Sequence, residues 1–428
     1  MTTPSEFQQQ CSEIKHVIDV KRWVIALSGG LDSMVTLELA HRYLSDLPII
    51  ALHVNHQQQS SANAWQEFCE EQCALRNIPY HSVTVSPQGN CEKQLRDARY
   101  QCFENFIMAG DCLLFGHHAN DQAETMLFRL VRGAGVKGLS AMPRQRSIGK
   151  ALLLRPLLSI SREQLASYAK TQNLVWIDDP SNNSLDYDRN FLRHKVLAPL
   201  TEHWPKASEQ MSRSALLLSQ EHVLLNQYLA SDLPSIIIDG GLDLTLWKKL
   251  EEIKAHALLR YWINSKIGII VGQKALQRII VDVIESRIDS AGFCPLGAFE
   301  LRRFKSRLYI VTANLAFEPW PVFSNNQLNY QLLQGSLSLE PAESGIEIKE
   351  GMYLQHKVDG MTLVPVNRGR KKLKKLFQEQ AIPPWQREYW PLIMFKSEIV
   401  AIPGICICEG WLQQEKNKSL FWPQWQAM

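Results

Sequence analysis

Short apolar runs alternate with helix-length segments over the first 200 residues of this chain. The apolar runs are rich in Val, Ile, Leu and aromatic residues, as β-strands are, and lie at Arg22–Leu27, Ile49–Val54, Tyr80–Val85 and Cys112–Phe115. The helical segments between them are Ser33–Ser45, Ala62–Asn77 and Glu92–Ala109. Because strands that alternate with helices build βαβ units, we expect an α/β domain whose parallel sheet is covered on both faces. Ligands of such domains bind where the strands end.

The composition narrows the class of protein. Of 428 residues, 45% are hydrophobic and 21% are charged, which is typical of a soluble globular chain with room for two or three domains. No apolar run approaches the roughly 20 residues of a membrane helix, and the first 18 residues lack the apolar centre of a signal peptide. The nine cysteines include no CxxC pair, which favours small buried hydrophobes over a metal or redox site. We expect a cytoplasmic protein.

Beyond residues 202–212 the alternation of strands and helices ends. Helical periodicity continues at Ser214–Leu229, Thr245–Lys266 and Lys274–Ile288, and a hairpin is expected around Phe299–Val311. The last part mixes strand-like runs with one basic helix. We predict an α/β domain at 1–211, a mostly helical domain at 212–312, a linker at 313–345 and a small basic α+β domain at 346–428.

Positive charge gathers at the end of the chain. Residues 351–428 hold 11 Lys and Arg against 6 Asp and Glu, whereas the preceding 350 residues hold 35 against 37. The overall net charge of +3 is therefore a poor guide to partners. A local excess of this kind suits a module that grips phosphates, and a solvated surface is the plainer alternative.

The loop after the first strand reads Ser28-Gly29-Gly30-Leu31-Asp32-Ser33. Its glycines let backbone N–H groups approach an anion, and the following helix points its positive end at the same place. An aspartate would repel phosphate, so Asp32 suggests a bound Mg²⁺. The plainer alternative is a tight turn with a serine that caps the helix. The string is neither a Walker A loop nor a Rossmann fingerprint.

The complete SGGLDS string, placed after the first strand of a βαβ series, resembles the signature of the PP-loop ATP pyrophosphatases. That resemblance implies an enzyme that cleaves ATP to AMP and pyrophosphate while it adenylates a substrate. It also implies that Ser28–Ser33 bind the phosphates of ATP, with Arg99 as a further phosphate contact. His53, at the end of the second strand, then flanks the adenine or simply packs there.

A second string, Gly116-His117-His118-Ala119-Asn120-Asp121-Gln122-Ala123-Glu124-Thr125, follows the fourth strand. On a helix, Asp121 and Glu124 share one face, where they can hold Mg²⁺ or accept a proton from an amine. Acidic residues also suit any first helical turn, because the helix dipole favours them there. The string resembles the GHHxxDQxET element of PP-loop enzymes that act on tRNA. A glycine-rich loop with Arg132 and Lys137 follows it.

Three further strings narrow the resemblance to the tRNA(Ile)-lysidine synthetase family. They are Arg96–Tyr100, Leu154–Leu158, and Trp176–Asn182 with its continuation Tyr187–Arg193. By this resemblance Arg132, Lys137, Arg189 and Arg193 contact tRNA, although Arg193 pairing with Asp178 and Asp179 in a structural cluster is an equal alternative. One basic helix near the C-terminus is expected to contact the tRNA backbone. Its outward-facing cations are Arg370, Lys371, Lys372, Lys374 and Lys375.

The resemblance implies a two-step reaction on the wobble cytidine of a tRNA(Ile) with a CAU anticodon. ATP adenylates the base, and free L-lysine then attacks C2, which gives lysidine, AMP and pyrophosphate. Asp32, Asp121 and Glu124 are the expected catalytic residues, and Asp32 and Asp121 the expected Mg²⁺ ligands. Two alternatives stay open: a PP-loop enzyme that adenylates another tRNA base or a small molecule, and a tRNA-binding protein without catalysis.

Overall fold

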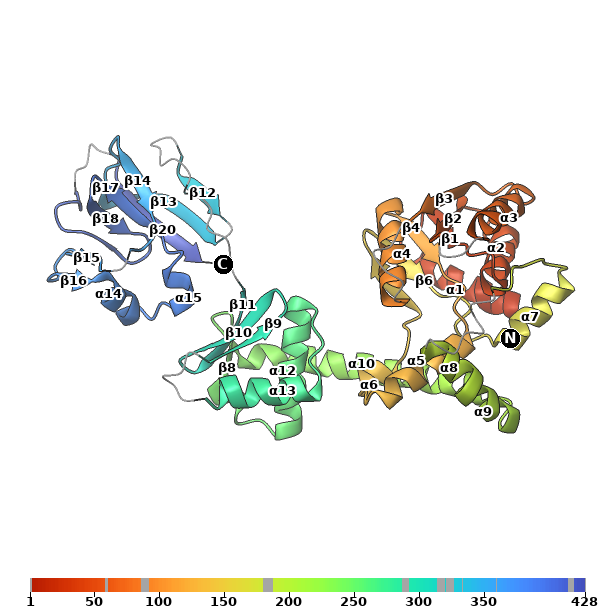
Figure 1. The fold of residues 1–428 in the computed structure, drawn as a ribbon. Helices are drawn as coiled ribbons and strands as arrows, with labels where there is room; N and C mark the ends of the chain where they lie inside the picture. The colour runs from red at the N-terminus through yellow and green to blue at the C-terminus, as the bar shows by residue number, and fades with distance from the viewer. Residues whose placement is uncertain are drawn as a thin grey trace. The chain divides into compact units, whose positions relative to one another are not determined.

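The computed structural model describes residues 2–57, 61–85, 92–179, 188–286, 292–313, 320, 327–332, 334–358, 360–414 and 419–427 (Figure 1). Its internal contacts divide the chain into two units, Met1–Tyr228 and Leu229–Met428. None of the described helices is long and apolar enough to cross a membrane.

A six-stranded sheet forms the centre of the first unit, in the order β3-β2-β1-β4-β6-β5. The strands are β1 (Arg22–Ala26), β2 (Ile49–Asn55), β3 (Tyr80–Thr84), β4 (Asp111–Leu114), β5 (Gln145–Ile148) and β6 (Ala151–Leu154). β1 runs parallel to both β2 and β4, and only β5, at the edge, is antiparallel to its neighbour. The four predicted strands and the parallel sheet are confirmed. The β5–β6 hairpin was not anticipated, since Gln145, Arg146 and Ser147 are exposed and carry no apolar pattern.

The described helices of the first unit begin with α1 (Thr3–Val17), α2 (Leu31–Tyr43), α3 (Ala62–Ala74), α4 (Glu92–Phe106), α5 (Ala119–Val131), α6 (Val136–Leu139), α7 (Arg162–Thr171), α8 (Asp188–Phe191) and α9 (Ala198–His203). Of these, α2, α3 and α4 connect consecutive strands as the sequence predicts, whereas α1 precedes β1 and α7, α8 and α9 follow β6. A π-helical segment, η2 (Leu192–Leu197), joins α8 to α9. The long helix α10 (Ala207–Asp232) follows and crosses into the second unit.

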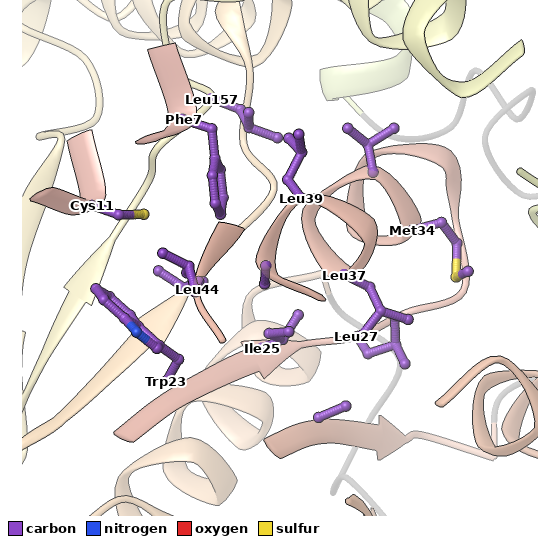
Figure 2. Close-up of a cluster of buried hydrophobic side chains, with 14 of the residues drawn as sticks. Phe7, Cys11, Trp23, Ile25, Leu27, Met34, Leu37, Leu39, Leu44 and Leu157 are labelled. Carbon is purple, nitrogen blue, oxygen red and sulfur yellow. The ribbon is translucent and has the colours of Figure 1, made fainter. Parts of the chain in front are cut away.

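The sheet is buried on both faces, which explains why its strands are continuous apolar runs. Figure 2 shows Ile25 of β1 below the helix that carries Leu37 and Leu39, and Trp23 of the same strand beside Leu44. On the opposite face, Val24 of the same strand packs with Phe103 of α4. Eight of the nine cysteines are described, all as free thiols, and five of these eight are buried, as expected of small hydrophobes.

The second unit begins with a helical part that also holds a five-stranded antiparallel sheet, ordered β7-β8-β11-β10-β9. Its elements are the 3-10 turn η3 (Leu233–Ile236), β7 (Ile237–Ile238), β8 (Gly241–Asp243), α11 (Leu244–Trp247), α12 (Glu252–Ile267), α13 (Gln273–Ile279), the π-helical turn η4 (Ile280–Ile284), β9 (Phe293–Leu296), β10 (Phe299–Phe304) and β11 (Arg307–Thr312). The helix predicted over Thr245–Lys266 is divided into α11 and α12, the helix predicted from Lys274 begins as α13, and the β10–β11 hairpin is confirmed. Ile288, the expected end of the last helix, lies outside the described residues.

The C-terminal part is rich in β-structure around its own core, to which Leu337, Leu373, Phe377 and Trp425 belong. Its elements are β12 (Asn329–Leu332), β13 (Gly335–Ile346), β14 (Met352–Gln355), β15 (Thr362–Leu363), β16 (Lys371–Lys372), α14 (Leu373–Glu379), α15 (Pro384–Arg387), β17 (Leu392–Phe395), β18 (Glu398–Ile402), β19 (Cys406–Ile407) and β20 (Phe421–Ala427).

The linker expected over 313–345 needs a correction, because its described end is part of this domain. β13 pairs with β12 on one side and with β20 on the other. Its first half alternates inward Leu337 and Leu339 with polar residues, a two-residue period that the surrounding polarity concealed. β20 is more than 70 residues away along the chain, so local sequence did not reveal the pairing.

Gly116 lies where the loop after β4 crosses the first turn of α2. A Cβ at this position would lie 2.7 Å from the carbonyl oxygen of Asp32 and 2.9 Å from Thr36 Oγ1. Both atoms are fixed, because Thr36 Oγ1 donates a hydrogen bond to that same carbonyl oxygen. Only glycine therefore lets the two loops approach this closely.

We predict that Gly116→Ala destabilises the first unit by about 1–3 kcal/mol, the usual cost of forcing an extra carbon into a packed site. Urea unfolding followed by tryptophan fluorescence measures the loss. Gly135→Ala is the matched control, since a Cβ there would meet no atom within 4 Å. Equal midpoints for the two variants would contradict the prediction.

Candidate active site

The loop Ser28–Ser33 is held open by hydrogen bonds among its own residues. Ser33 Oγ donates to the carbonyl oxygen of Gly30 at 2.9 Å and accepts the backbone N–H of Ser28 at 3.2 Å. Gly30 caps α2, so the free N–H groups of the first helical turn lie at the loop. An anion bound there meets several donors and the positive end of the helix dipole.

Gly29 connects this loop to the segment that follows α7. Its φ of +83° favours glycine, and an added Cβ would lie 2.8 Å from Ile177 Cδ1 and 3.1 Å from Cys69 Sγ. The backbone N–H of Ile177 also donates to the carbonyl oxygen of Gly29 at 2.9 Å. Ile177 therefore supports the phosphate loop, a role that the sequence did not indicate.

A cavity of about 690 Å³ opens at the carboxyl ends of β1, β2 and β4. Most site residues predicted in the first unit line it: Ser28, Gly30, Asp32, Ser33, His53, Arg99, Asp121, Arg189 and Arg193. Leu31 is buried in the first turn of α2, and Glu124 is buried in α5. The position of the cavity agrees with the topology of the sheet. The chain continues from β1 to β2 on one side and from β4 toward β6 on the other, so the two connections leave the sheet in opposite directions, and ligands bind at such a point.

His118 lies between the two expected metal ligands. Its Nε2 is 3.5 Å from Asp32 Oδ2 and 3.6 Å from Asp121 Oδ2. Burial alone would lower the pKa of His118, but these carboxylates outweigh it and raise that pKa to about 9. Burial likewise opposes ionisation of Asp121, yet the neighbouring His118 and His117 and a backbone N–H hold its pKa at about 2. His118 and Asp121 thus form a largely buried ion pair.

Asp32 retains one oxygen for a ligand. Its Oδ1 is buried and has no hydrogen-bond partner among the described residues. A buried carboxylate oxygen without a donor is costly unless a cation or a water satisfies it. Mg²⁺ characteristically combines one or two carboxylates with substrate phosphates and waters, so Asp32 and Asp121 fit that ion. Among the described side chains there is no group of three His, Cys, Asp or Glu with metal-site geometry.

Two arginines enclose Glu124, whose side chain is 1% exposed. Arg193, in η2, donates to both carboxylate oxygens at 2.6 and 3.2 Å, and Arg189 Nε lies 3.5 Å away. Burial raises the pKa of Glu124, while the arginines oppose that rise. Arg193 also lies 3.9 Å from Asp121. The arginine expected to contact tRNA thus pairs with both carboxylates of the second string.

His53 and Arg99 line the same cavity. His53 Nδ1 lies 2.9 Å from the carbonyl oxygen of Leu27, an acceptor, so this nitrogen carries the proton. Burial lowers the pKa of His53, which keeps its ring neutral. Arg99 reaches the cavity from α4. His53 and Arg99 can therefore pack in the cavity wall and also contact a ligand.

Comparison with known proteins adds the family. A PP-loop domain model matches residues 3–200, a TilS substrate binding domain model matches 242–309, and a TilS substrate C-terminal domain model matches 355–422. The tRNA(Ile)-lysidine synthase of Vibrio vulnificus is 36% identical over 94% of this chain and 95% of its own length. The Coxiella burnetii enzyme of that name is 38% identical over 90% and 89%.

The chain belongs to the tRNA(Ile)-lysidine synthase family.

This tRNA(Ile)-lysidine synthase homologue carries its other expected tRNA contacts outside the cavity. Arg132 ends α5, where its guanidinium lies 3.8 Å from the ring centroid of Phe128 and 3.3 Å from Asp188. Lys137 is exposed in α6. Both residues thus occupy an exposed segment beside the arginines that line the cavity.

The basic helix near the C-terminus is shorter than predicted. Arg370 precedes it, and Lys371 and Lys372 form β16, which pairs with β15. Only Lys374 and Lys375 lie on α14, whose inward residues Leu373, Leu376 and Phe377 are buried as expected. Lys371 pairs with Glu379, so it is not free to face outward. Arg370, Lys372, Lys374 and Lys375 are exposed.

We predict that Arg193→Met destabilises the first unit by about 3 kcal/mol, because it leaves the buried carboxylate of Glu124 without its bidentate partner. The double variant Arg193→Met/Glu124→Gln should regain most of that loss. Urea unfolding of the parent, of Arg193→Met, of Glu124→Gln and of the double variant completes the cycle.

Arg132→Met is the matched control, because its guanidinium pairs with the exposed Asp188. Such a surface pair contributes less than about 1 kcal/mol. If Glu124→Gln failed to rescue Arg193→Met, the arginine would stabilise the unit by packing alone.

Proposed function

We propose that this chain ligates L-lysine to C2 of the wobble cytidine of tRNA(Ile) with a CAU anticodon, and that it consumes ATP and releases AMP and pyrophosphate. One observation carries the proposal: the phosphate loop, Asp32 and Asp121 meet at one cavity of a chain that matches this family along nearly its whole length. The cytoplasm, where tRNA, ATP and free lysine occur together, is the expected compartment.

The first step activates an inert carbonyl. The C2 oxygen of cytosine is a poor leaving group, so it attacks the α-phosphorus of ATP, and pyrophosphate departs. Negative charge builds on the phosphates during this attack. Backbone N–H groups of Ser28–Ser33 and the positive end of α2 are already oriented to stabilise it. Mg²⁺ held by Asp32 and Asp121 would supply further charge neutralisation.

In the second step the ε-amine of lysine attacks C2, and AMP departs with the former carbonyl oxygen. The amine has a pKa of about 10.4 in water, so it arrives as an ammonium ion and must release one proton to a water molecule before its lone pair can attack C2. Asp121 lines the cavity and is ionised, which suits it to bind and orient that cation. Glu124 is enclosed by arginines, so we assign it a positioning role: it holds Arg189 and Arg193 at the cavity wall.

The exposed arginines and lysines are the residues that we expect to contact the tRNA. Arg189 and Arg193 line the cavity, Arg132 and Lys137 lie on the exposed segment beside them, and the C-terminal domain adds a separate basic surface. We define this surface by four residues: Arg370, Lys372, Lys374 and Lys375. Contacts of this kind position RNA through its backbone, so they contribute affinity rather than base specificity.

Asp32→Ala should lower pyrophosphate release at least about 100-fold while the fold is retained, because charge stabilisation of the departing phosphates is worth that much in comparable sites. The assay contains the purified chain, ATP, Mg²⁺, labelled lysine and bulk tRNA. Asp19→Ala, which alters an exposed aspartate, is the control. Near-normal turnover of Asp32→Ala would contradict the assigned role.

The same assay separates the alternatives. Label in tRNA supports the proposed ligation. Pyrophosphate release that needs no tRNA would indicate an enzyme that adenylates a small molecule, and neither signal would indicate a binding protein.

Replacing Lys372, Lys374 and Lys375 together with alanine should weaken tRNA binding and flatten its salt dependence. Each phosphate that a lysine no longer neutralises lowers the slope of log affinity against log salt by about 0.7–0.9, so a change of about 2 to 3 is expected. ATP affinity should be unaltered, because the cavity belongs to the first unit. Three exposed lysines of that unit, Lys21, Lys150 and Lys170, give the control variant. An unaltered slope of log affinity against log salt would show that these lysines are solvated and do not contact tRNA phosphates.

A further inference from the structure

Arg155 is a buried arginine whose hydrogen bonds go to neutral groups. It follows β6 and is 2% exposed. Nη1 donates to the carbonyl oxygen of Pro143 at 2.6 Å, and Nε donates to His117 Nδ1 at 3.2 Å. It also bonds the Tyr100 side chain. Among the described residues it forms no ion pair with a carboxylate. A buried cation in such surroundings is expensive, which indicates a function other than stability.

The bond to His117 fixes where that imidazole carries its proton. A guanidinium has only N–H donors and keeps its charge in proteins. His117 Nδ1 must therefore offer a lone pair, and the one proton of the neutral ring must lie on Nε2. Protonation of Nδ1 would place two donors face to face. Arg155 thus holds His117 in a single tautomer.

The proton on Nε2 is available to a ligand. His117 follows β4 and lines the cavity, and its bond to Arg155 is its one hydrogen bond within the described part of the chain. The charged groups that influence it are Asp121 from α5, Arg155 after β6, Arg99 from α4 and Arg189 from α8. Burial first, and then these three arginines, lower the pKa of His117 to about 3 against the opposing effect of Asp121. The ring therefore stays neutral.

We infer that Arg155 is a positioning residue that fixes His117 as a neutral Nε2–H donor, and that this donor binds a phosphoryl oxygen of the nucleotide. Arg99 and Arg189 line the same cavity and likewise only donate, which makes this wall suitable for an anion. The inference rests on the proposed use of ATP. It also removes His117 as a base for the lysine ammonium, because the lone pair that would take the proton is already engaged by Arg155.

Nuclear magnetic resonance of the full chain with ¹⁵N-labelled histidine tests the tautomer without reference to activity. The chain has 12 histidines, and the spectrum of His117→Gln assigns the signal. We expect Nδ1 to be unprotonated and Nε2 protonated from pH 6 to 9. In Arg155→Met, which removes the donors and keeps the apolar stem, Nδ1 protonation should appear. A protonated Nδ1 in the parent chain at pH 7 would overturn the inference, whatever the reaction catalysed.

The ligand contact is tested by the position of a replacement nitrogen. The amide nitrogen of Gln lies near Nε2 of His, and that of Asn near Nδ1. His117→Gln should therefore bind inorganic pyrophosphate and ATP at least about tenfold more tightly than His117→Asn, the loss expected for one hydrogen bond to a charged group. His16→Gln, on the exposed end of α1, serves as the control. Equal affinities for Gln and Asn would refute the contact. If the two variants differ as expected but the parent chain itself forms no lysidine, the nucleotide contact stands and the proposed function fails.

Discussion

The pairing of β1 with β4 is the constraint on which the site depends. Because β1 is flanked by β2 on one side and β4 on the other, the chain leaves the sheet in opposite directions after these strands. The phosphate loop and the second string are more than 80 residues apart, and this pairing brings them to one edge. Gly116 then permits the close approach of the two loops, so that Asp32 and Asp121 can share His118.

The charged side chains of the cavity fall into two groups, the carboxylates and the arginines. The carboxylates Asp32 and Asp121 lie around one charged imidazole, and Arg99, Arg189 and Arg193 contribute to the wall of the same cavity. Glu124, behind that wall, has its charge matched by arginines before any ligand arrives. A site prearranged in this way needs little reorganisation as negative charge develops on a substrate.

Much of the first unit could be predicted because its signals are local. Strands buried on both faces give continuous apolar runs, and the phosphate loop is one contiguous string. Long-range partners could not be predicted. Arg193 pairs with Glu124 across 69 positions, and Arg155 bonds His117 across 38. Lys371 and Lys372 looked helical from the spacing of Leu373 and Leu376, but pairing with β15 makes them a strand. Which site residues act in catalysis stays a prediction.

The packing beneath Gly29 has a consequence for how sequences of this kind can diverge. Ile177 fills the space that a side chain at position 29 would need, and it also donates its N–H to the carbonyl oxygen of that residue. The two positions are therefore coupled: a larger residue at 29 requires a smaller one at 177, and the left-handed backbone at 29 makes even that exchange costly. Drift at residue 177 is thus limited by a loop nearly 150 positions earlier, although residue 177 itself carries no chemistry.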